Sequence, residues 1–130
     1  MSPSTARAKV TRYIQFVGAV RIVYGVLAIF QPRFVAKFFG LNPDDPDARA
    51  WNAFLGSRDI AIGVHALAAR DPARQRDAIW LNQGCEVFDS MVVGQEIRQG
   101  RPFGMFTAAA IIFNAGMHAI WLRVRVLLRD

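Results

Sequence analysis

Four apolar segments joined by short charged loops constrain this chain more than any other feature of its sequence. Each segment has about 20 residues, and a helix of that length, rising about 1.5 Å per residue, crosses the hydrocarbon layer of a bilayer, which is roughly 30 Å thick. Short loops make consecutive helices antiparallel neighbours. The sequence therefore predicts an all-α fold, a four-transmembrane-helix up-down bundle that forms one domain over residues 1–130. The predicted helices are residues 10–30, 48–69, 78–98 and 103–127.

The segment after the first predicted helix, residues 32–41, is amphipathic. Its aromatic and aliphatic side chains share one side of a helix, and Arg33 and Lys37 lie on the other. A segment of this kind typically lies in the plane of the membrane interface. We therefore expect a short interfacial helix between the first and second spans, and its apolar side comprises Phe34, Val35, Phe38 and Phe39.

Segments that contain Pro and charged residues predict the loops. Residues 42–47 combine Pro with Asp, and the last of them, Asp47, is the expected N-cap of the second span. Residues 70–77 are charged and contain Pro72, which predicts a loop before the third span. Residues 99–102 predict a compact stop before the fourth span.

The aromatic residues favour a lipid environment over water. The mean hydropathy of +0.21 fits either a polar membrane protein or an apolar soluble one. However, the aromatic residues near the segment ends lie where an interfacial belt is expected. The third span is polar enough for a soluble bundle, but in a membrane its polar line would face the bundle interior. The belt residues are Tyr13, Trp51, Trp80 and Trp121.

The basic residues set the expected orientation. If both termini and the loop between the second and third spans share one side, that side carries nine Lys and Arg, and the other side carries five. The positive-inside rule then places both termini in the cytoplasm. The net charge of +6 arises from the loops rather than from a basic stripe on a helix, so we expect no nucleic-acid partner. The nine are Arg7, Lys9, Arg12, Arg70, Arg74, Arg76, Arg123, Arg125 and Arg129, and the five are Arg33, Lys37, Arg49, Arg98 and Arg101.

The third span carries a line of polar side chains. Asn82, Glu86 and Asp89 follow one another at i, i+4 and i+7, which is one narrow face of a helix. Two carboxylates are costly to bury without partners. The other spans offer partners, and Gly18 and Gly25 on the first span let a neighbouring helix come close. The expected partners, which would converge with this line in one pocket, are Arg21, Tyr24, Arg58, Asp59, His65, Asn114 and His118.

Two arginines face three carboxylates in this set, so at least one acid lacks an arginine partner. In a site of low dielectric such an acid tends to hold its proton, which is the state that a general acid or a proton carrier requires. We therefore predict that Asp89 and Glu86 are the general acid and base, with Asp59 as a third candidate, and that the other polar residues orient the substrate. The alternative is a buried structural network whose ion pairs fix the register of the helices.

A metal site is a competing interpretation of the same residues. His65 and His118 with Glu86 and Asp89 form a possible two-His, two-carboxylate set, but no His-x-x-x-His or Glu-x-x-His pair fixes its geometry. The single cysteine, Cys85, excludes a cysteine cluster and an intramolecular disulfide. We expect neither a metal nor a cofactor.

The motif Gly56-Ser-Arg-Asp-Ile-Ala-Ile-Gly63 follows a first helix with Arg21-x-x-Tyr-Gly25 and an aromatic interfacial segment. This layout resembles the small four-helix bacterial membrane proteins of the DoxX-like group and related families of unknown function. The resemblance implies the fold and a location in the bacterial inner membrane. It implies no particular chemistry.

Three functions fit these features. The leading hypothesis is a membrane-embedded enzyme that applies acid–base chemistry to a lipophilic small molecule, such as isomerisation, cyclisation or epoxide opening, with the substrate entering from the bilayer. The second is a small proton-coupled transporter that acts as a homo-oligomer and exchanges protons at Glu86 or Asp89. The third is a non-catalytic membrane subunit whose polar face binds a partner helix.

Overall fold

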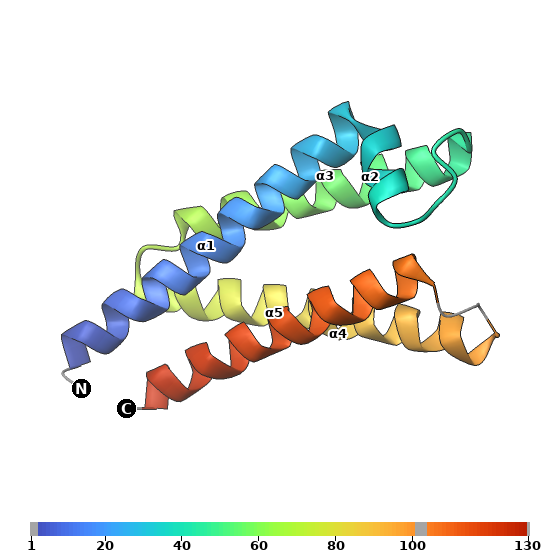
Figure 1. Cartoon of the computed structure of the whole chain (residues 1–130). Coiled ribbons are helices and arrows are strands. Elements are labelled where there is room, and N and C mark those ends of the chain that lie inside the picture. Colours follow the sequence, from blue (N-terminus) through green and yellow to red (C-terminus); the bar gives the residue numbers. More distant parts are fainter. Residues whose placement is uncertain (1–2, 101–103, 130) are drawn as a thin grey trace.

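The computed structural model describes residues 3–100 and 104–129, and these residues form an all-α fold without a strand (Figure 1). Four long helices and one short helix follow one another in the order that the sequence predicts. Their bounds are α1 Pro3–Phe30, α2 Pro32–Phe38, α3 Pro46–Ala68, α4 Pro72–Arg98 and α5 Met105–Arg129.

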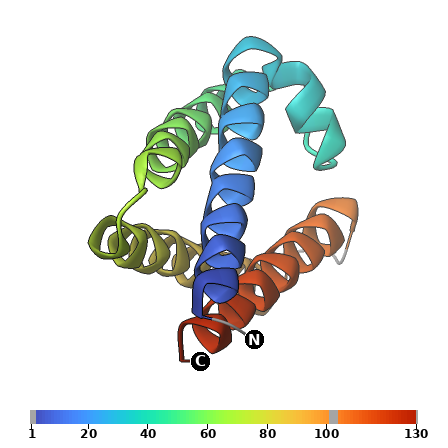
Figure 2. The same cartoon turned by 90° about the vertical axis from the view of Figure 1, so that its left-hand side faces the viewer.

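The long helices form two antiparallel pairs. Among the described helices, α1 and α3 make the most extensive contact, and α4 pairs with α5 (Figure 1). The two pairs converge where the chain begins and ends, and both views show the start of α1 beside the end of α5 (Figures 1 and 2). They diverge toward the opposite end, where α2 lies against α1 and α3. We call the converging end the terminal end.

The starts of α3 and α4 differ from the sequence prediction because Pro begins these helices instead of lying in the loops before them. Asp71 is the N-cap of α4: its carboxylate accepts hydrogen bonds from the backbone N–H of Ala73 and Arg74, at 3.1 and 3.0 Å. Pro72 occupies the first helical turn, where its fixed φ fits and its missing N–H costs nothing. The loop predicted over residues 70–77 is therefore wrong, since most of it is helix. The hydrogen bond from the Arg74 N–H lowers the pKa of Asp71.

The start of α3 repeats this pattern. Asp45, rather than the predicted Asp47, is the N-cap, and it accepts a hydrogen bond of 2.9 Å from the Asp47 N–H. Pro46 again occupies the first turn. The first helix begins at Pro3, earlier than predicted, and the predicted start of the last helix, Phe103, lies outside the described residues.

The hydrophobic core lies at the terminal end, where all four long helices meet. Trp121 belongs to this core and is completely buried. The predicted position of Trp121 in an interfacial belt is wrong, because its side chain packs into the core with residues of α1, α3 and α4. Trp51 and Trp80 are exposed, as a belt would require. The other core residues are Val10, Ile14, Val17, Ala66, Ala69, Ala78, Ile79, Met117, Val124 and Leu127.

Beyond this core, the described residues bury charge and expose apolar side chains. Arg21, Asp59 and Glu86 are buried. In contrast, Phe30 is 73% exposed and Phe88 is 67% exposed. Two helical segments, Ser4–Phe30 and Thr107–Leu128, are long and apolar enough to cross a membrane. No other described helix meets that criterion, so the four-span bundle is not confirmed.

Candidate functional site

The seam between α1 and α3 positions the site, and four glycines form it. Gly25 of α1 lies against Gly56 of α3, and Gly18 lies against Gly63. A Cβ atom at Gly25 would be 2.4 Å from the Gly56 carbonyl oxygen, and one at Gly63 would be 2.6 Å from that of Gly18. The two backbones are therefore in direct contact, which confirms the close approach predicted at Gly18 and Gly25. Arg21 lies between these two contacts and is held against α3.

Arg21 is the centre of a charged network, and its guanidinium contacts three side chains on two helices. Its Nε atom donates a hydrogen bond of 2.7 Å to Oδ1 of Asn82. Its Nη1 atom pairs with Asp59 of α3, and its Nη2 atom pairs with Glu86 of α4. The side chain of Arg21 is only 3% exposed. One buried cation thus connects α1, α3 and α4.

A second arginine continues the network toward the surface. Arg58 of α3 donates two parallel hydrogen bonds, each 3.0 Å long, to the two carboxylate oxygens of Asp89 on α4. Its Nη2 atom also lies 3.6 Å from Oδ1 of Asp59, which links the second pair to the first. The side chains of Arg58 and Asp89 are 32% and 33% exposed. We call the six residues Arg21, Arg58, Asp59, Asn82, Glu86 and Asp89 the charged cluster.

The orientation of Asn82 follows from its place on α4. Its amide nitrogen donates a hydrogen bond of 2.8 Å to the Ala78 carbonyl one turn earlier. That bond leaves Oδ1 facing the guanidinium of Arg21, for which an oxygen acceptor is required. The polar line predicted on the third span therefore does face α1 and α3, and each of its three members contacts an arginine.

Glu86 is the most enclosed acid of the charged cluster. It has no exposed surface, and only its Oε1 atom contacts Arg21. Its Oε2 atom has no hydrogen-bond partner among the described residues. The charged cluster holds two guanidinium groups and three carboxylates, so it carries one excess negative charge when all its groups are ionised. A buried charge without a full complement of partners is costly, and a proton, a cation or a hydrogen-bond donor would offset that cost.

Four of the predicted substrate-binding residues lie outside the charged cluster. The Tyr24 ring packs edge-on against Phe39, next to α2. His118 contacts a hydroxyl rather than an acid, since its Nε2 atom lies 3.1 Å from Oγ of Ser90. Asn114 donates to the Ala110 carbonyl of its own helix at 2.9 Å. His65 is exposed two turns from Arg58 along α3, so the predicted convergence fails for this residue.

Two polar residues that the sequence analysis missed line the same helices. Asn52 is buried on α3, and its amide nitrogen has no partner among the described residues. It precedes Asp59 by seven residues, so helical periodicity could have found it. Ser90 follows Asp89 directly, but its contact with His118 depends on how α5 docks.

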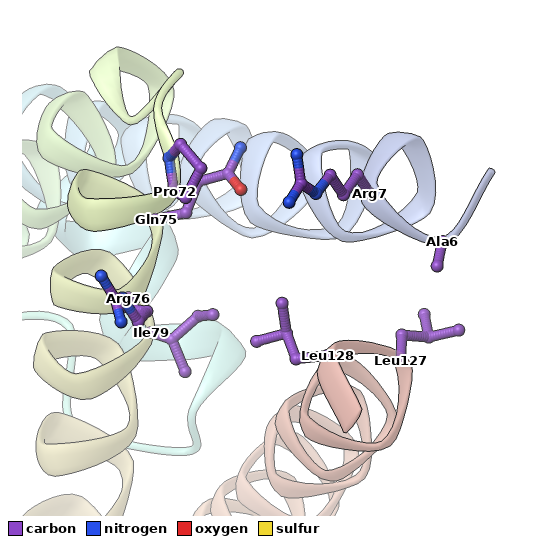
Figure 3. Close-up of a pocket in the computed structure, with 8 residues that line it drawn as sticks. All are labelled: Ala6, Arg7, Pro72, Gln75, Arg76, Ile79, Leu127 and Leu128. Atoms are coloured by element: carbon purple, nitrogen blue, oxygen red, sulfur yellow. The ribbon is translucent and has the colours of Figure 1, made fainter. Parts of the chain in front are cut away.

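Two pockets lie at the terminal end. One, with a volume of about 440 Å³, opens between α1, α4 and α5 (Figure 3). Another, of about 330 Å³, lies between Lys9, Arg12, Tyr13, Phe16 and Arg123. Within the described part of the chain, no three His, Cys, Asp or Glu side chains are grouped closely enough to hold a metal ion.

The comparisons with known proteins show the family and no chemistry. Residues 18–122 match the family described as "Domain of unknown function (DUF4267)", and the chain belongs to this family. The match spans the glycine seam and the whole charged cluster. It agrees with the expected family of unknown function and does not itself connect the chain to the DoxX-like group. Neither a curated protein nor a solved structure is similar enough to the chain to count as a match.

Proposed function

We propose that this member of the DUF4267 family is a multi-pass protein of the bacterial inner membrane that applies acid–base chemistry to a lipophilic small molecule. Its inverted distribution of side chains supports the membrane location. In water it would be unfavourable to expose Phe30 and Phe88 and to bury Arg21 and Glu86. In a bilayer, lipid solvates the apolar surface, and the charged groups pair inside the bundle. All four long helices then span the bilayer, with both termini in the cytoplasm.

The helices α3 and α4 are not apolar enough to be recognised as spans from composition alone. They fit this proposal because their charged side chains face inward. In α3 and α4 the ionised groups in mid-helix are Arg58, Asp59, Glu86 and Asp89, and all four belong to the charged cluster. Membrane proteins place such groups toward the bundle interior and pair them. The outer face of α4 is apolar, with Phe88, Met91 and Val92 exposed.

The free Oε2 atom of Glu86 is the observation that carries the proposed chemistry. This atom is available to exchange a proton, and a proton bound there would neutralise the excess negative charge of the cluster. Asp89 lies at the edge of the cluster and is about one-third exposed, so a ligand from the bilayer would reach it first. An isomerisation would use Glu86 to add a proton to one carbon or oxygen of the substrate and Asp89 to remove a proton from another. Arg58 and Asn82 would orient the substrate, and Asp59 is the third candidate for proton transfer.

A direct test uses protein purified in detergent and incubated with a lipid extract of the source membrane. Compounds that remain bound to the wild type and to Glu86→Gln are identified by mass spectrometry before and after incubation. We expect both proteins to retain the same apolar compound and only the wild type to convert it. Gln95→Glu, an exposed change on the same helix, is the control and should convert it normally. If neither protein retains a compound, or if Glu86→Gln converts it as fast as the wild type, the proposed chemistry is wrong.

One observation favours a second candidate, a non-catalytic membrane subunit. Each carboxylate of the charged cluster contacts an arginine, and Asp89 is held by both of its oxygens. Joining helices is a sufficient role for such a network. In that case the exposed apolar face of α4 would bind a partner span. This candidate predicts that Glu86→Gln leaves every retained compound unchanged and that the protein copurifies with another membrane protein.

A further inference from the structure

We propose that the pocket at the terminal end binds an anionic phospholipid, with the phosphate between Arg7 and Arg76 and an acyl chain along α5. The inference rests on the membrane location in the proposed function and is independent of the acid–base chemistry. It concerns a site that shares no residue with the charged cluster.

The pocket has two kinds of wall. Arg7 of α1 and Arg76 of α4 approach it from different sides, and Leu128 of α5 projects into the space between the two helices (Figure 3). Ala6, Ile79 and Leu127 supply further apolar surface. The volume of about 440 Å³ is within the range of roughly 300–1,000 Å³ that small-molecule sites occupy. The combination of cationic and apolar walls fits an amphiphile rather than a purely polar or purely apolar ligand.

The charges of the pocket favour an anion. Arg7 and Arg76 are both exposed, and neither takes part in an ion pair within residues 3–100 and 104–129. The nearest helix start, that of α4, is already capped by Asp71, whose carboxylate also contacts Arg74 at 3.3 Å. The two guanidinium groups are therefore the available partners. A guanidinium can offer a phosphate two parallel N–H donors, and two of them can hold one headgroup from both sides.

A buried side-chain amide connects the two helices that carry the arginines of the pocket. Gln75 lines the pocket, is only 8% exposed, and donates a hydrogen bond of 2.9 Å to Oγ1 of Thr11. The Thr11 hydroxyl in turn donates to the Arg7 carbonyl at 3.1 Å. The Gln75–Thr11 bond joins the first turn of α4 to the third turn of α1 at the terminal end. The two arginines are consequently carried by helices that are already docked to each other.

Position in the membrane favours a lipid as the source of the phosphate. In the proposed orientation the terminal end faces the cytoplasm, whose leaflet carries the anionic lipids. Leu128 lines the pocket at the end of α5 and is 47% exposed, so an acyl chain against it would replace contact with bulk lipid. A soluble phosphate would gain nothing from that apolar wall.

The test compares lipid binding by native mass spectrometry in detergent, with phosphatidylglycerol and phosphatidylcholine of identical chains as probes. The site variant is Arg7→Gln/Arg76→Gln. The control is Lys37→Gln/Arg98→Gln, which removes the same charge from exposed positions at the opposite end. We expect the wild type to prefer phosphatidylglycerol and the site variant to bind it about thirtyfold more weakly, since each arginine near an anionic headgroup contributes roughly fivefold. The control should keep the wild-type preference.

Three results would overturn the inference. Equal binding of the two lipids by the wild type means that the pocket does not select an anion. Equal loss in the site variant and the control means that net charge, rather than this pocket, attracts the lipid. Displacement of phosphatidylglycerol by an equal concentration of glycerol 3-phosphate means that the site takes a soluble phosphate. Recovery of the protein from the soluble fraction without detergent would instead contradict the membrane location, and hence the proposed function as well.

Discussion

The α1–α3 seam and the charged cluster join helices in opposite ways. At the seam the helices touch because four glycines provide no side chain, so the backbones themselves determine the distance. At the cluster, α4 is joined to α1 and α3 through long side chains that carry charge. A steric contact of the first kind has one arrangement, whereas an electrostatic contact changes with protonation or a bound ligand. The difference indicates that α1 and α3 form a fixed frame and that α4 is the adjustable element.

Removal of the central cation should have the largest effect. Arg21→Met leaves Asp59 and Glu86 buried without their main partner, and we expect a loss of about 3–5 kcal/mol in the free energy of unfolding. Unfolding in mixed micelles, followed by circular dichroism, measures it. The matched variant Arg21→Met/Asp59→Asn/Glu86→Gln removes the stranded charges and should recover most of that loss. A triple variant as unstable as the single one would show that charge is not what joins α4 to the frame.

A single methyl group tests the seam. Gly25→Ala places a Cβ atom 2.4 Å from the Gly56 carbonyl oxygen and 2.6 Å from Ile60, so the helices must separate. We expect a loss of about 1–3 kcal/mol, as for other overpacked sites. Gly116→Ala is the control, because a Cβ atom there meets open space, and it should add about 0.5–1 kcal/mol through helix propensity. Equal effects of the two substitutions would contradict direct backbone contact at the seam.

These two regions also show which features of the structure the sequence predicts and which it does not. Helical periodicity predicts that Asn82, Glu86 and Asp89 share a face, and glycine spacing predicts a close neighbour for α1. Periodicity does not predict which acid pairs with which arginine, because that depends on the register of α3 against α4. It also places His65 on the face of Arg58, but at the terminal end α3 turns its neighbour Ala66 into the core, and His65 remains exposed. Periodicity also does not predict that Trp121 is buried or that Pro72 begins α4, because helix packing determines the first and capping by Asp71 the second.

The edge of the charged cluster should tolerate change better than its centre. Arg58→Lys keeps the charge but replaces the two-bond contact with Asp89 by a point charge. The pair is about one-third exposed, so solvent screening limits the expected loss to about 0.5–1 kcal/mol. Arg33→Lys, in the exposed ion pair with Asp44, is the control and should change stability by less than about 0.5 kcal/mol. A loss at Arg58 as large as that at Arg21 would contradict the division into centre and edge.

The smallest effect is expected outside both regions, at the N-cap of α4. Because the folded state lowers the pKa of Asp71, its ionised form stabilises the fold above its ordinary pKa of about 3.9. That contribution is lost as the pH falls through the lower folded value. Asp71→Ala should therefore lower Tm slightly at neutral pH, and the difference from the wild type should vanish in acid. A difference in Tm that persists in acid would show that Asp71 does not act through its charge.

The distance between helices tests the contrast between a fixed frame and an adjustable α4 most directly. Spin labels at exposed positions in a Cys85→Ser background would report on two pairs, Val23 with Ala61 for α1 and α3, and Ala61 with Val92 for α3 and α4. Pulsed electron paramagnetic resonance in reconstituted bilayers would compare the wild type with Arg21→Met. We predict an unchanged α1–α3 distance and a longer, broader α3–α4 distribution. An unchanged α3–α4 distribution, or an α1–α3 distance that changes as much as the α3–α4 distance, would contradict the contrast between a fixed frame and an adjustable α4.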